Sequence, residues 1–340
     1  MKWEFIAERK NDFLKNCLVY EAFEDNFVCV FGRPHPGYLT VRHGMSYSHY
    51  IDNKSASELS RFLLEKTKSN PKFLEEIHET GKRHFNNLLG FCSSLKNPEN
   101  KTKEELLEAI KEYFRLYKMP YPYFLITVAP DAFEKEKNTG AINTMAKLRF
   151  EGRASYNKTH EIVLPLFKEI AGRLNLSVEE LKFLQPSEII ALLEGKNLDT
   201  KSLINSRQHC FFVHSHGKSV LHENASLEIK EGKPDEIRGR GTFPAKYRGK
   251  AKLIHNKDDI KNIGYGDIIV LQMTTTDLIT KGIEKAGAII TDEGGITCHA
   301  ALLSMEMNIP ALIGTRIATK RLKDGDIVEI DTEKGIAKKV

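Results

Sequence analysis

Cysteine is scarce in this chain, and its few copies are widely spaced. The five cysteines are Cys17, Cys29, Cys92, Cys210 and Cys298, an odd number with no CxxC pair among them. Such a set does not suggest a disulfide framework, and it is typical of proteins kept in a reducing compartment. We therefore predict a cytoplasmic protein.

Long apolar runs and basic stripes are also missing. No run approaches the roughly 18 apolar residues that a membrane-spanning helix needs, and the N-terminal segment carries charges throughout where a signal peptide has an apolar core. The 51 Lys and Arg residues are interleaved with 46 Asp and Glu residues, for a net charge of +5. These absences argue against a membrane protein, an exported protein and a nucleic-acid-binding protein.

The composition that remains is that of an ordinary globular protein, with 41% hydrophobic and 29% charged residues in a length of 340. That length favours two domains. We predict an α+β multidomain fold with a mainly helical N-terminal domain and a small β element over residues 1–222. A charged, glycine-containing linker follows over residues 223–241, and an α/β domain occupies residues 242–340.

Local patterns place the elements of the first domain. Residues 17–42 alternate loosely and contain several Gly and Pro residues, which predicts a short hairpin or an irregular strand pair. Residues 208–222 predict a β-hairpin that turns at His216-Gly217. Capping patterns predict helix starts at Ser55, Asn70, Thr102 and Ser177.

Short apolar runs alternate with turns in the second domain. The predicted strands are residues 267–272, 288–291, 311–313 and 327–330, followed by a last strand after the turn at residues 333–335. Residues 300–307 predict a short helix.

The stretch Thr291-Asp-Glu-Gly-Gly-Ile-Thr-Cys-His-Ala300 lies between a predicted strand and this helix. Gly294 and Gly295 allow a tight turn and a close approach of the backbone to a ligand. Thr297 suits the N-cap position, which places His299 in the first helical turn, where free N–H groups favour an anion. A neutral imidazole is a competent nucleophile near pH 7, so His299 is the candidate catalytic residue for accepting a phosphoryl group. From the residues alone, a capping or packed histidine is the competing interpretation.

The same stretch resembles the phosphohistidine signature of the phosphoenolpyruvate (PEP)-utilising enzymes, which include PEP synthase, pyruvate phosphate dikinase and enzyme I of the sugar phosphotransferase system. The family pattern is Gly-Gly-x-Thr-[Ser/Cys]-His-Ala, a small helix, then Ile-Pro-Ala and a Gly. The matching residues are Gly294, Gly295, Thr297, Cys298, His299, Ala300, Ile309, Pro310, Ala311 and Gly314. The resemblance covers about residues 240–340.

This resemblance implies a swivelling β/β/α domain that carries phosphate from an ATP site to a pyruvate or PEP site. His299 inherits the phospho-acceptor role. Gly294, Gly295, Thr297 and Cys298 inherit phosphate-supporting positions, although a small first-turn residue is the simpler interpretation of Cys298.

Two positions depart from the family. An Arg often stands six residues after the histidine, where this chain has Met305, and another often stands where this chain has Ile296. Arg pairs with phosphate bidentately, so its loss removes charge-assisted hydrogen bonds. Either another basic residue substitutes, the phosphoryl state is weaker, or the activity is lost. The basic residues nearby in sequence are Lys281, Lys285 and Arg316.

Residues 150–194 resemble, more distantly, the helical segment that precedes the carrier domain in PEP-synthase-like proteins and in rifampicin phosphotransferase. The family's ATP-grasp domain has no counterpart in the pattern of residues 1–230, and a (β/α)8 barrel needs roughly 250 residues of its own. We therefore expect a separate ATP-grasp polypeptide as partner. ATP and Mg²⁺ would be bound there, and this chain would bind no cofactor directly.

Three alternatives stay open at this stage. The histidines at 209, 214, 216 and 222, with Cys210, fit no standard zinc spacing, so we expect no metal site. The aromatic residues at 113–124 could line a substrate pocket, but a helix-packing core is favoured. The chain as a whole could be a phosphotransferase component whose acceptor is pyruvate or another small molecule, or a non-catalytic regulatory or binding module that retains the carrier fold.

Overall fold

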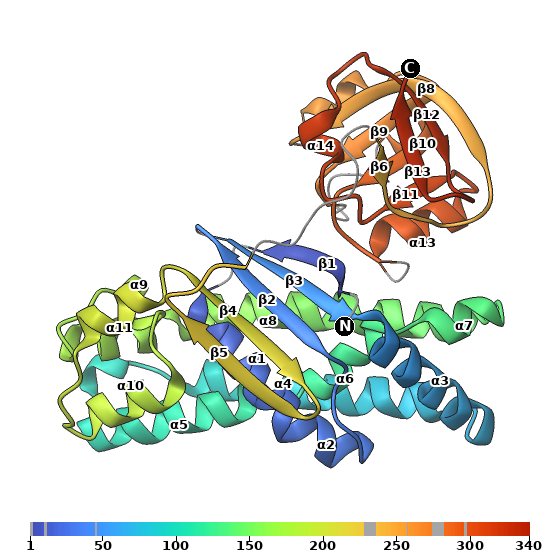
Figure 1. The fold of residues 1–340 in the computed structure, drawn as a ribbon. Coiled ribbons are helices and arrows are strands. Elements are labelled where there is room, and N and C mark those ends of the chain that lie inside the picture. The colour runs from blue at the N-terminus through green and yellow to red at the C-terminus, as the bar shows by residue number, and fades with distance from the viewer. Residues whose placement is uncertain are drawn as a thin grey trace. The chain divides into compact units, whose positions relative to one another are not determined.

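The computed structural model describes residues 3–9, 12–44, 46–227, 236–256, 258–273, 282–295 and 298–340. Within them the chain forms two compact units, one centred on residues 9–227 and one on residues 228–340. Each unit has its own sheet and its own buried core (Figure 1). The fold is therefore α+β and multidomain, as predicted.

The N-terminal unit combines a five-stranded sheet with many helices. The strand order is β1-β3-β2-β4-β5, with antiparallel pairing from β3 through β2 and β4 to β5. The strands are β1 (Trp3–Arg9), β2 (Tyr38–His43), β3 (Ser46–Asp52), β4 (Cys210–Ser215) and β5 (Lys218–Glu223). The helices are α1 (Phe13–Glu24), α2 (Asn26–Phe31), α3 (Asn53–Ser69), α4 (Phe73–Ser94), α5 (Lys103–Lys118), α6 (Tyr121–Leu125), α7 (Asp131–Lys135), α8 (Thr139–Arg173), α9 (Val178–Leu181), α10 (Pro186–Leu193) and α11 (Thr200–Ser206).

Aromatic side chains join α1 to the sheet. Phe13 and Tyr20 of α1 lie against Phe212 of β4, with ring centroids 5.4 and 5.0 Å from it, and the Tyr20 hydroxyl donates a hydrogen bond to the Phe212 carbonyl at 3.1 Å. The hairpin of β4 and β5 turns at His216 and Gly217, both with positive φ, which confirms the prediction.

The predicted strand pair over residues 17–42 is wrong for its first half. Residues 13–31 form α1 and α2, and only residues 38–43 form a strand, β2. The run of large apolar residues fits a buried helix as well as a strand, and its burial on several sides favours the helix. Asp12 supplies the N-cap by accepting a hydrogen bond from the Lys15 N–H at 2.8 Å.

Two of the four predicted helix starts are confirmed. Thr102 and Ser177 each form a complete capping box with the Glu three residues later. The other two are displaced: α3 is capped by Asp52, whose carboxylate accepts from the Ser55 N–H, and α4 begins at Phe73 after the cap residue Lys72. Aspartate caps a helix about as well as serine, and Asp52 lies upstream of Ser55, so the helix starts earlier than predicted.

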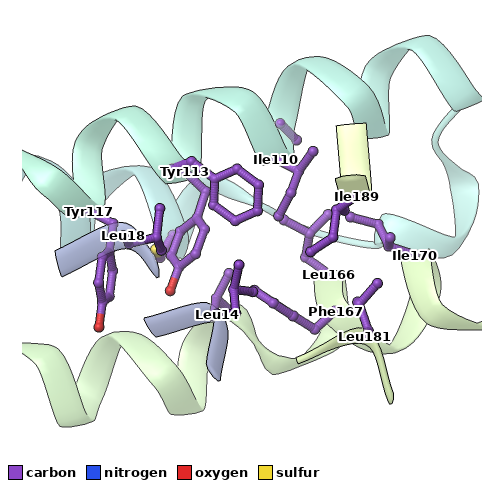
Figure 2. Close-up of a cluster of buried hydrophobic side chains, with 14 of the residues drawn as sticks. Leu14, Leu18, Ile110, Tyr113, Tyr117, Leu166, Phe167, Ile170, Leu181 and Ile189 are labelled. Carbon is purple, nitrogen blue, oxygen red and sulfur yellow. The ribbon is translucent and has the colours of Figure 1, made fainter. Parts of the chain in front are cut away.

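The core of the N-terminal unit fills the space between α1, α5 and α8 (Figure 2). The aromatic residues Tyr113, Phe114 and Tyr117 are buried in it, with Tyr121 and Phe124 packed at its margin. The helix-packing interpretation of this aromatic cluster is therefore confirmed.

The C-terminal unit is built on an eight-stranded sheet with the order β6-β13-β12-β8-β9-β10-β11-β7. Its elements are β6 (Ile237–Arg238), β7 (Arg240–Gly241), β8 (Lys246–Ile254), β9 (Asp267–Leu271), β10 (Ala286–Thr291), α13 (His299–Glu306), β11 (Ala311–Ile313), α14 (Ala318–Arg321), β12 (Ile327–Asp331) and β13 (Ile336–Lys339). The strands and the short helix predicted in this region are present. Strands β6, β7 and β8 were not predicted from the sequence.

The residues at the ends of the predicted linker, 223–241, are paired in strands. Glu223 lies in β5, and residues 237–241 form β6 and β7. Only Gly239 separates β6 from β7, which stand at opposite ends of the strand order, so this glycine brings the two edges of the sheet together. A β-carbon at Gly239 would lie 2.8 Å from the Ile313 carbonyl oxygen, which explains why glycine is needed there.

Alternating residues of the central strands divide the core of this unit into two layers. Ile269, Leu271 and Ile289 pack with Ala300 and Ala301 of α13. The intervening residues of the same strands pack on the other face with β12, β13 and α14. This period of two is what a sheet covered on both faces requires, and it agrees with a β/β/α arrangement.

None of the helices in the part of the chain that the structure describes combines the length and apolar character needed to cross a bilayer.

Candidate functional site

The predicted phosphohistidine stretch lies at one edge of the parallel part of the C-terminal sheet. Strands β9, β10 and β11 run parallel, so their carboxyl ends, at Leu271, Thr291 and Ile313, share that edge. The chain leaves β10 at Thr291, turns through Gly294 and Gly295, and enters α13 (Figure 1). Ligands of open α/β sheets bind at the carboxyl ends of the strands, so the helix begins where such a ligand is expected.

His299 is the first residue of α13. Its N-cap is Cys298, which has the extended cap conformation (φ −79°, ψ 161°) and supplies no side-chain capping hydrogen bond. The Cys298 N–H donates to the Gly295 carbonyl at 2.8 Å, and the Cys298 carbonyl accepts from the Leu302 N–H at 3.1 Å. The predicted N-cap was Thr297. The structure puts the cap one residue later, and Thr297 itself lies outside the described residues.

A helix start without a side-chain cap leaves backbone N–H groups of the first turn without an intrahelical partner. These groups and the positive end of the helix dipole favour an anion at this position, by about 0.3–1 kcal/mol for an exposed site.

The His299 imidazole is half-buried. Burial lowers its pKa below 6.5, and the Glu306 carboxylate opposes that shift more weakly. The Nδ1 atom is enclosed and has no hydrogen-bond partner among the described residues. The ring is therefore neutral near pH 7, and its other nitrogen, Nε2, is the one left for an incoming group.

The two glycines before the helix have different roles. Gly294 has φ +114°, and a β-carbon there would lie 2.7 Å from the Cys298 sulfur. Gly295 would place its β-carbon in open space. Gly314, with φ +72° in the loop after β11, approaches so closely that a β-carbon on it would lie 2.8 Å from the Gly294 carbonyl oxygen. Gly294 and Gly314 thus allow the two loops to touch, whereas Gly295 leaves room beside the helix start.

Asp292, which was not predicted as a site residue, links the segment after β10 to the segment after β11. The buried carboxylate accepts a hydrogen bond from the Thr315 hydroxyl at 2.9 Å, and from the backbone N–H of Thr319 at 3.3 Å and the Thr319 hydroxyl. The Asp292 carbonyl accepts from the Arg316 N–H at 2.9 Å. In the sequence, a carboxylate directly after a predicted buried strand could have indicated a residue of the site, because sites of open α/β sheets lie at the carboxyl ends of the strands.

Of the three basic residues that could substitute for the family arginines, the structure describes Arg316 and Lys285. Arg316 has φ +71° and follows Thr315 in the loop after β11, and the Lys285 ammonium lies 5.9 Å from the centre of the Tyr265 ring. Lys281 and Ile296 lie outside the described residues. Met305 is partly buried in α13.

The histidines around the β4–β5 hairpin do not form a metal site. Among the described residues no group of three or more His, Cys, Asp or Glu could hold a metal ion. His214 is fully buried and its Nδ1 lies 2.9 Å from the Ser219 hydroxyl, whereas His216 is exposed at the turn. His216 lies beyond the end of β4, so it does not share the buried environment of His214.

The chain is similar to known proteins over part of its length. Residues 263–335 match the family model "PEP-utilising enzyme, mobile domain". A probable phosphoenolpyruvate synthase of Archaeoglobus fulgidus is 38% identical over 185 residues, which are 53% of this chain and 24% of that protein. A probable phosphoenolpyruvate synthase of Methanothermobacter thermautotrophicus is 33% identical over 222 residues, which are 62% of this chain and 31% of that protein.

An uncharacterised phosphotransferase of Bacillus subtilis is 40% identical over 111 residues, which are 33% of this chain and 13% of that protein. The resemblance to PEP-utilising enzymes is therefore confirmed, and the chain has homologues named phosphoenolpyruvate synthase. The matched parts span about a quarter to a third of the two synthases.

Proposed function

We propose that this chain is a phosphotransferase component of the PEP synthase or dikinase type, which carries a phosphoryl group on His299. The observation that carries the proposal is the position of His299 as the first residue of α13, at the carboxyl edge of parallel strands, after an N-cap residue, Cys298, that makes no side-chain capping hydrogen bond among the described residues. An anionic phosphoryl group attached to this ring would lie beside the free N–H groups of the first turn.

The proposed step is an in-line displacement. The lone pair of Nε2 forms the N–P bond while the P–O bond of the donor breaks, and the leaving oxygen keeps the bonding electrons. The lowered pKa of His299 helps, because the ring must be neutral to attack. In the transfer to the acceptor, an acceptor oxygen forms the new P–O bond while the N–P bond breaks, and the neutral imidazole is restored.

Gly294, Gly295, Thr297 and Cys298 are the proposed phosphate-supporting residues. The open space at Gly295 suits a phosphoryl group beside the backbone, and the extended conformation of Cys298 begins the helix that presents His299.

The donor in this proposal is ATP, held with Mg²⁺ by a separate ATP-grasp protein, and the acceptor is pyruvate or another small molecule. The names of the relatives support this reaction class, and their greater length supports the participation of further domains.

The alternative is a non-catalytic regulatory or binding module that keeps the carrier fold. Met305 and Ile296, which stand where arginines are frequent in the family, favour this second function.

Labelling distinguishes the two. The full chain is incubated with each ATP-grasp protein of the same organism and with ATP labelled at the β- or γ-phosphate. A label on the chain that is lost in acid and kept in base identifies phosphohistidine. It should vanish in His299→Ala and persist in His255→Ala, which changes an exposed histidine of the same unit. No label with any of these partners would favour the regulatory module.

A further inference from the structure

Two histidines of the N-terminal unit, His35 and His214, are buried next to each other and have no role in the proposed carrier chemistry. His35 is 3% exposed and His214 is fully buried, and their ring centroids lie 5.9 Å apart. His35 belongs to residues 32–37, which link α2 to β2 and are called here the His35 segment, whereas His214 lies in β4. The two rings therefore form a contact between this segment and the β4–β5 hairpin.

One nitrogen of the His35 ring is bonded to a backbone acceptor. Its Nδ1 lies 2.7 Å from the Pro36 carbonyl oxygen, which can only accept, so Nδ1 carries the hydrogen of the neutral ring. The other nitrogen, Nε2, then has a lone pair and no hydrogen. This atom is buried and has no hydrogen-bond partner among the described residues. A second proton would therefore give His35 an N–H group without an acceptor.

The His214 ring is arranged in the same way. Its Nδ1 lies 2.9 Å from the Ser219 hydroxyl oxygen, and that hydroxyl donates its own hydrogen to the Tyr20 carbonyl at 3.3 Å. The hydroxyl oxygen therefore accepts from Nδ1, and Nε2 of His214 is again buried, unprotonated and without a partner in the part of the chain that the structure describes. Proton uptake by either ring would bury an unpaired N–H group, which is unfavourable.

Aromatic side chains enclose the pair. The Phe23 ring of α1 stacks on the His35 ring, with centroids 4.0 Å apart, and lies 5.2 Å from the His214 ring. The Phe27 ring of α2 meets the His35 ring edge-on at 4.9 Å, and the Tyr38 ring lies 5.8 Å from it. Such an enclosure solvates an imidazolium ion poorly, and two imidazolium rings this close would repel each other.

The charged and titratable groups on the surrounding elements have other partners or are exposed. Those with other partners are Tyr20 and Glu24 on α1, Arg33 on the His35 segment, Tyr38 on β2, His49 on β3 and Asp52 before α3. The exposed ones are Asp25 and Cys29 at α2, and His216 and Lys218 at the hairpin turn. No carboxylate of the described residues bonds to Nε2 of either ring, so a proton there would have no counter-ion.

Both rings are neutral in the folded chain near pH 7. Burial and the neighbouring His214 ring lower the pKa of His35 well below 6.5, and burial lowers the pKa of His214 to about 4, opposed by the backbone of His35. An exposed imidazole binds its proton at about pH 6.5. As the pH falls below 6.5, a form of the chain in which both rings are exposed therefore binds two more protons than the folded form and becomes more populated.

Side-chain packing holds the His35 segment against the hairpin. A β-carbon at Gly217 would lie 3.5 Å from Pro34, and one at Gly37 would lie 3.7 Å from the His214 carbonyl oxygen. No backbone hydrogen bond joins the segment to the hairpin within the described ranges, and Pro34 and Pro36 have no N–H group to donate. The position of the segment therefore depends on the buried His35 ring.

We propose that the His35–His214 pair is an acid-sensitive latch, in which proton uptake by both rings releases the His35 segment from α1 and the β4–β5 hairpin while the helical core stays folded. Each protonated ring must reach water, because its enclosure offers neither an acceptor nor a counter-ion. The latch belongs to the N-terminal unit alone and does not depend on the function proposed for His299.

Hydrogen exchange of the full chain tests the proposal. It is followed by mass spectrometry between pH 6.5 and pH 4.5 and corrected for the intrinsic exchange rates. Because opening takes up two protons, the opening constant of peptides that cover residues 32–42 should rise about a hundredfold per pH unit below pH 6. Peptides from α5 should change far less, because this helix belongs to the core and not to the latch.

Variants assign the two protons. His35→Asn and His214→Asn each remove one titratable ring and should each reduce the dependence to about tenfold per pH unit. His43→Asn changes an exposed histidine at the end of β2, so it is the matched control and should keep the hundredfold dependence. Circular dichroism checks that each variant is folded. If His35→Asn does not fold, His35→Phe, which keeps a ring beside Phe23, replaces it.

Three results would overturn the proposal. The first is a dependence of about tenfold or less per pH unit in the unmodified chain. The second is an unchanged dependence in His35→Asn or in His214→Asn. The third is an equal dependence in peptides of residues 32–42 and in peptides of α5, which would mean that acid unfolds the whole unit at once.

Discussion

The Asp292 carboxylate accepts a hydrogen bond from the Thr315 hydroxyl at 2.9 Å. With the further bonds from Thr319 of α14, this contact joins the segment after β10 to the loop and helix that follow β11. The chain continues from the first of these segments to His299, the first residue of α13.

Replacing Asp292 by Asn should therefore destabilise the C-terminal unit. The variant loses a charged acceptor that serves two hydroxyls and a backbone N–H, and we expect a loss of about 1.5–3 kcal/mol in the free energy of unfolding, measured by urea denaturation. Asp258→Asn is the matched control, because Asp258 forms an exposed ion pair with Lys261 whose loss should cost less than about 1 kcal/mol. Equal losses in the two variants would contradict the anchoring role.

The two adjacent glycines before α13 should respond differently to alanine. Gly294→Ala places a β-carbon 2.7 Å from the Cys298 sulfur at φ +114°, and strain of this kind costs about 1–3 kcal/mol. Gly295→Ala meets no atom within 4 Å and should change stability little. Thermal unfolding of both variants tests this, and a Gly295→Ala variant as unstable as Gly294→Ala would show that the loop is tightly packed throughout.

The ionisation of His299 should reflect its burial. Because burial lowers its pKa, the neutral form persists to a lower pH than in an exposed histidine, and the nucleophile is available at pH 6.5 and somewhat below. An NMR titration of the ring protons, assigned by their loss in His299→Ala, should give a midpoint below 6.5. A midpoint above 6.5 would mean that Glu306, and not burial, dominates the environment of the ring.

Acid should destabilise the N-terminal unit through buried histidines. Burial lowers the pKa of His214 to about 4, so the unfolded chain binds the proton first as the pH falls. The neutral His214 ring does not reduce the free energy of unfolding above about pH 6.5. As the pH falls from 6.5 towards 4, proton uptake by the unfolded chain lowers the free energy of unfolding by about 3 kcal/mol.

His214→Asn should therefore lose less stability than the unmodified chain between pH 7.5 and pH 4.5, as measured by urea denaturation at both values. His216→Asn, at the exposed turn of the same hairpin, is the control and should keep the full pH dependence. An unchanged pH dependence in His214→Asn would assign the acid sensitivity to other groups.

Arg207 should be among the most sensitive positions of the N-terminal unit. It is 1% exposed, forms two hydrogen bonds with the Glu188 carboxylate at 2.6 and 2.7 Å, and forms a third with Glu223 at 2.6 Å. Arg207→Met leaves both carboxylates without this partner and should cost about 3–5 kcal/mol in chemical denaturation. Arg115→Met, which breaks an exposed pair with Glu112, should cost under about 1 kcal/mol, and a similar cost for both would contradict the importance of burial.

Local sequence patterns were sufficient to predict much of the secondary structure. The capping boxes at Thr102 and Ser177, the turn at His216-Gly217, and the strands and helix from residue 267 onwards were all predictable, because each depends on residues a few positions apart. The glycine pair and histidine were also visible as a candidate site for the same reason. The helices over residues 13–31 were not, because short apolar runs broken by residues such as Lys15, Glu21 and Asp25 fit a strand and a helix equally until their neighbours are known.

The sequence by itself thus determined a helical half, an α/β half and a histidine beside a glycine turn. Each of these features depends on residues that are close together along the chain. Which side chains hold that histidine in place was settled only by folding. Parallel strand pairing brings Asp292 beside Thr315 and Thr319, and packing of the segment before β2 against β4 places His35 beside His214, because contacts between distant segments depend on how the sheet and helices assemble in space.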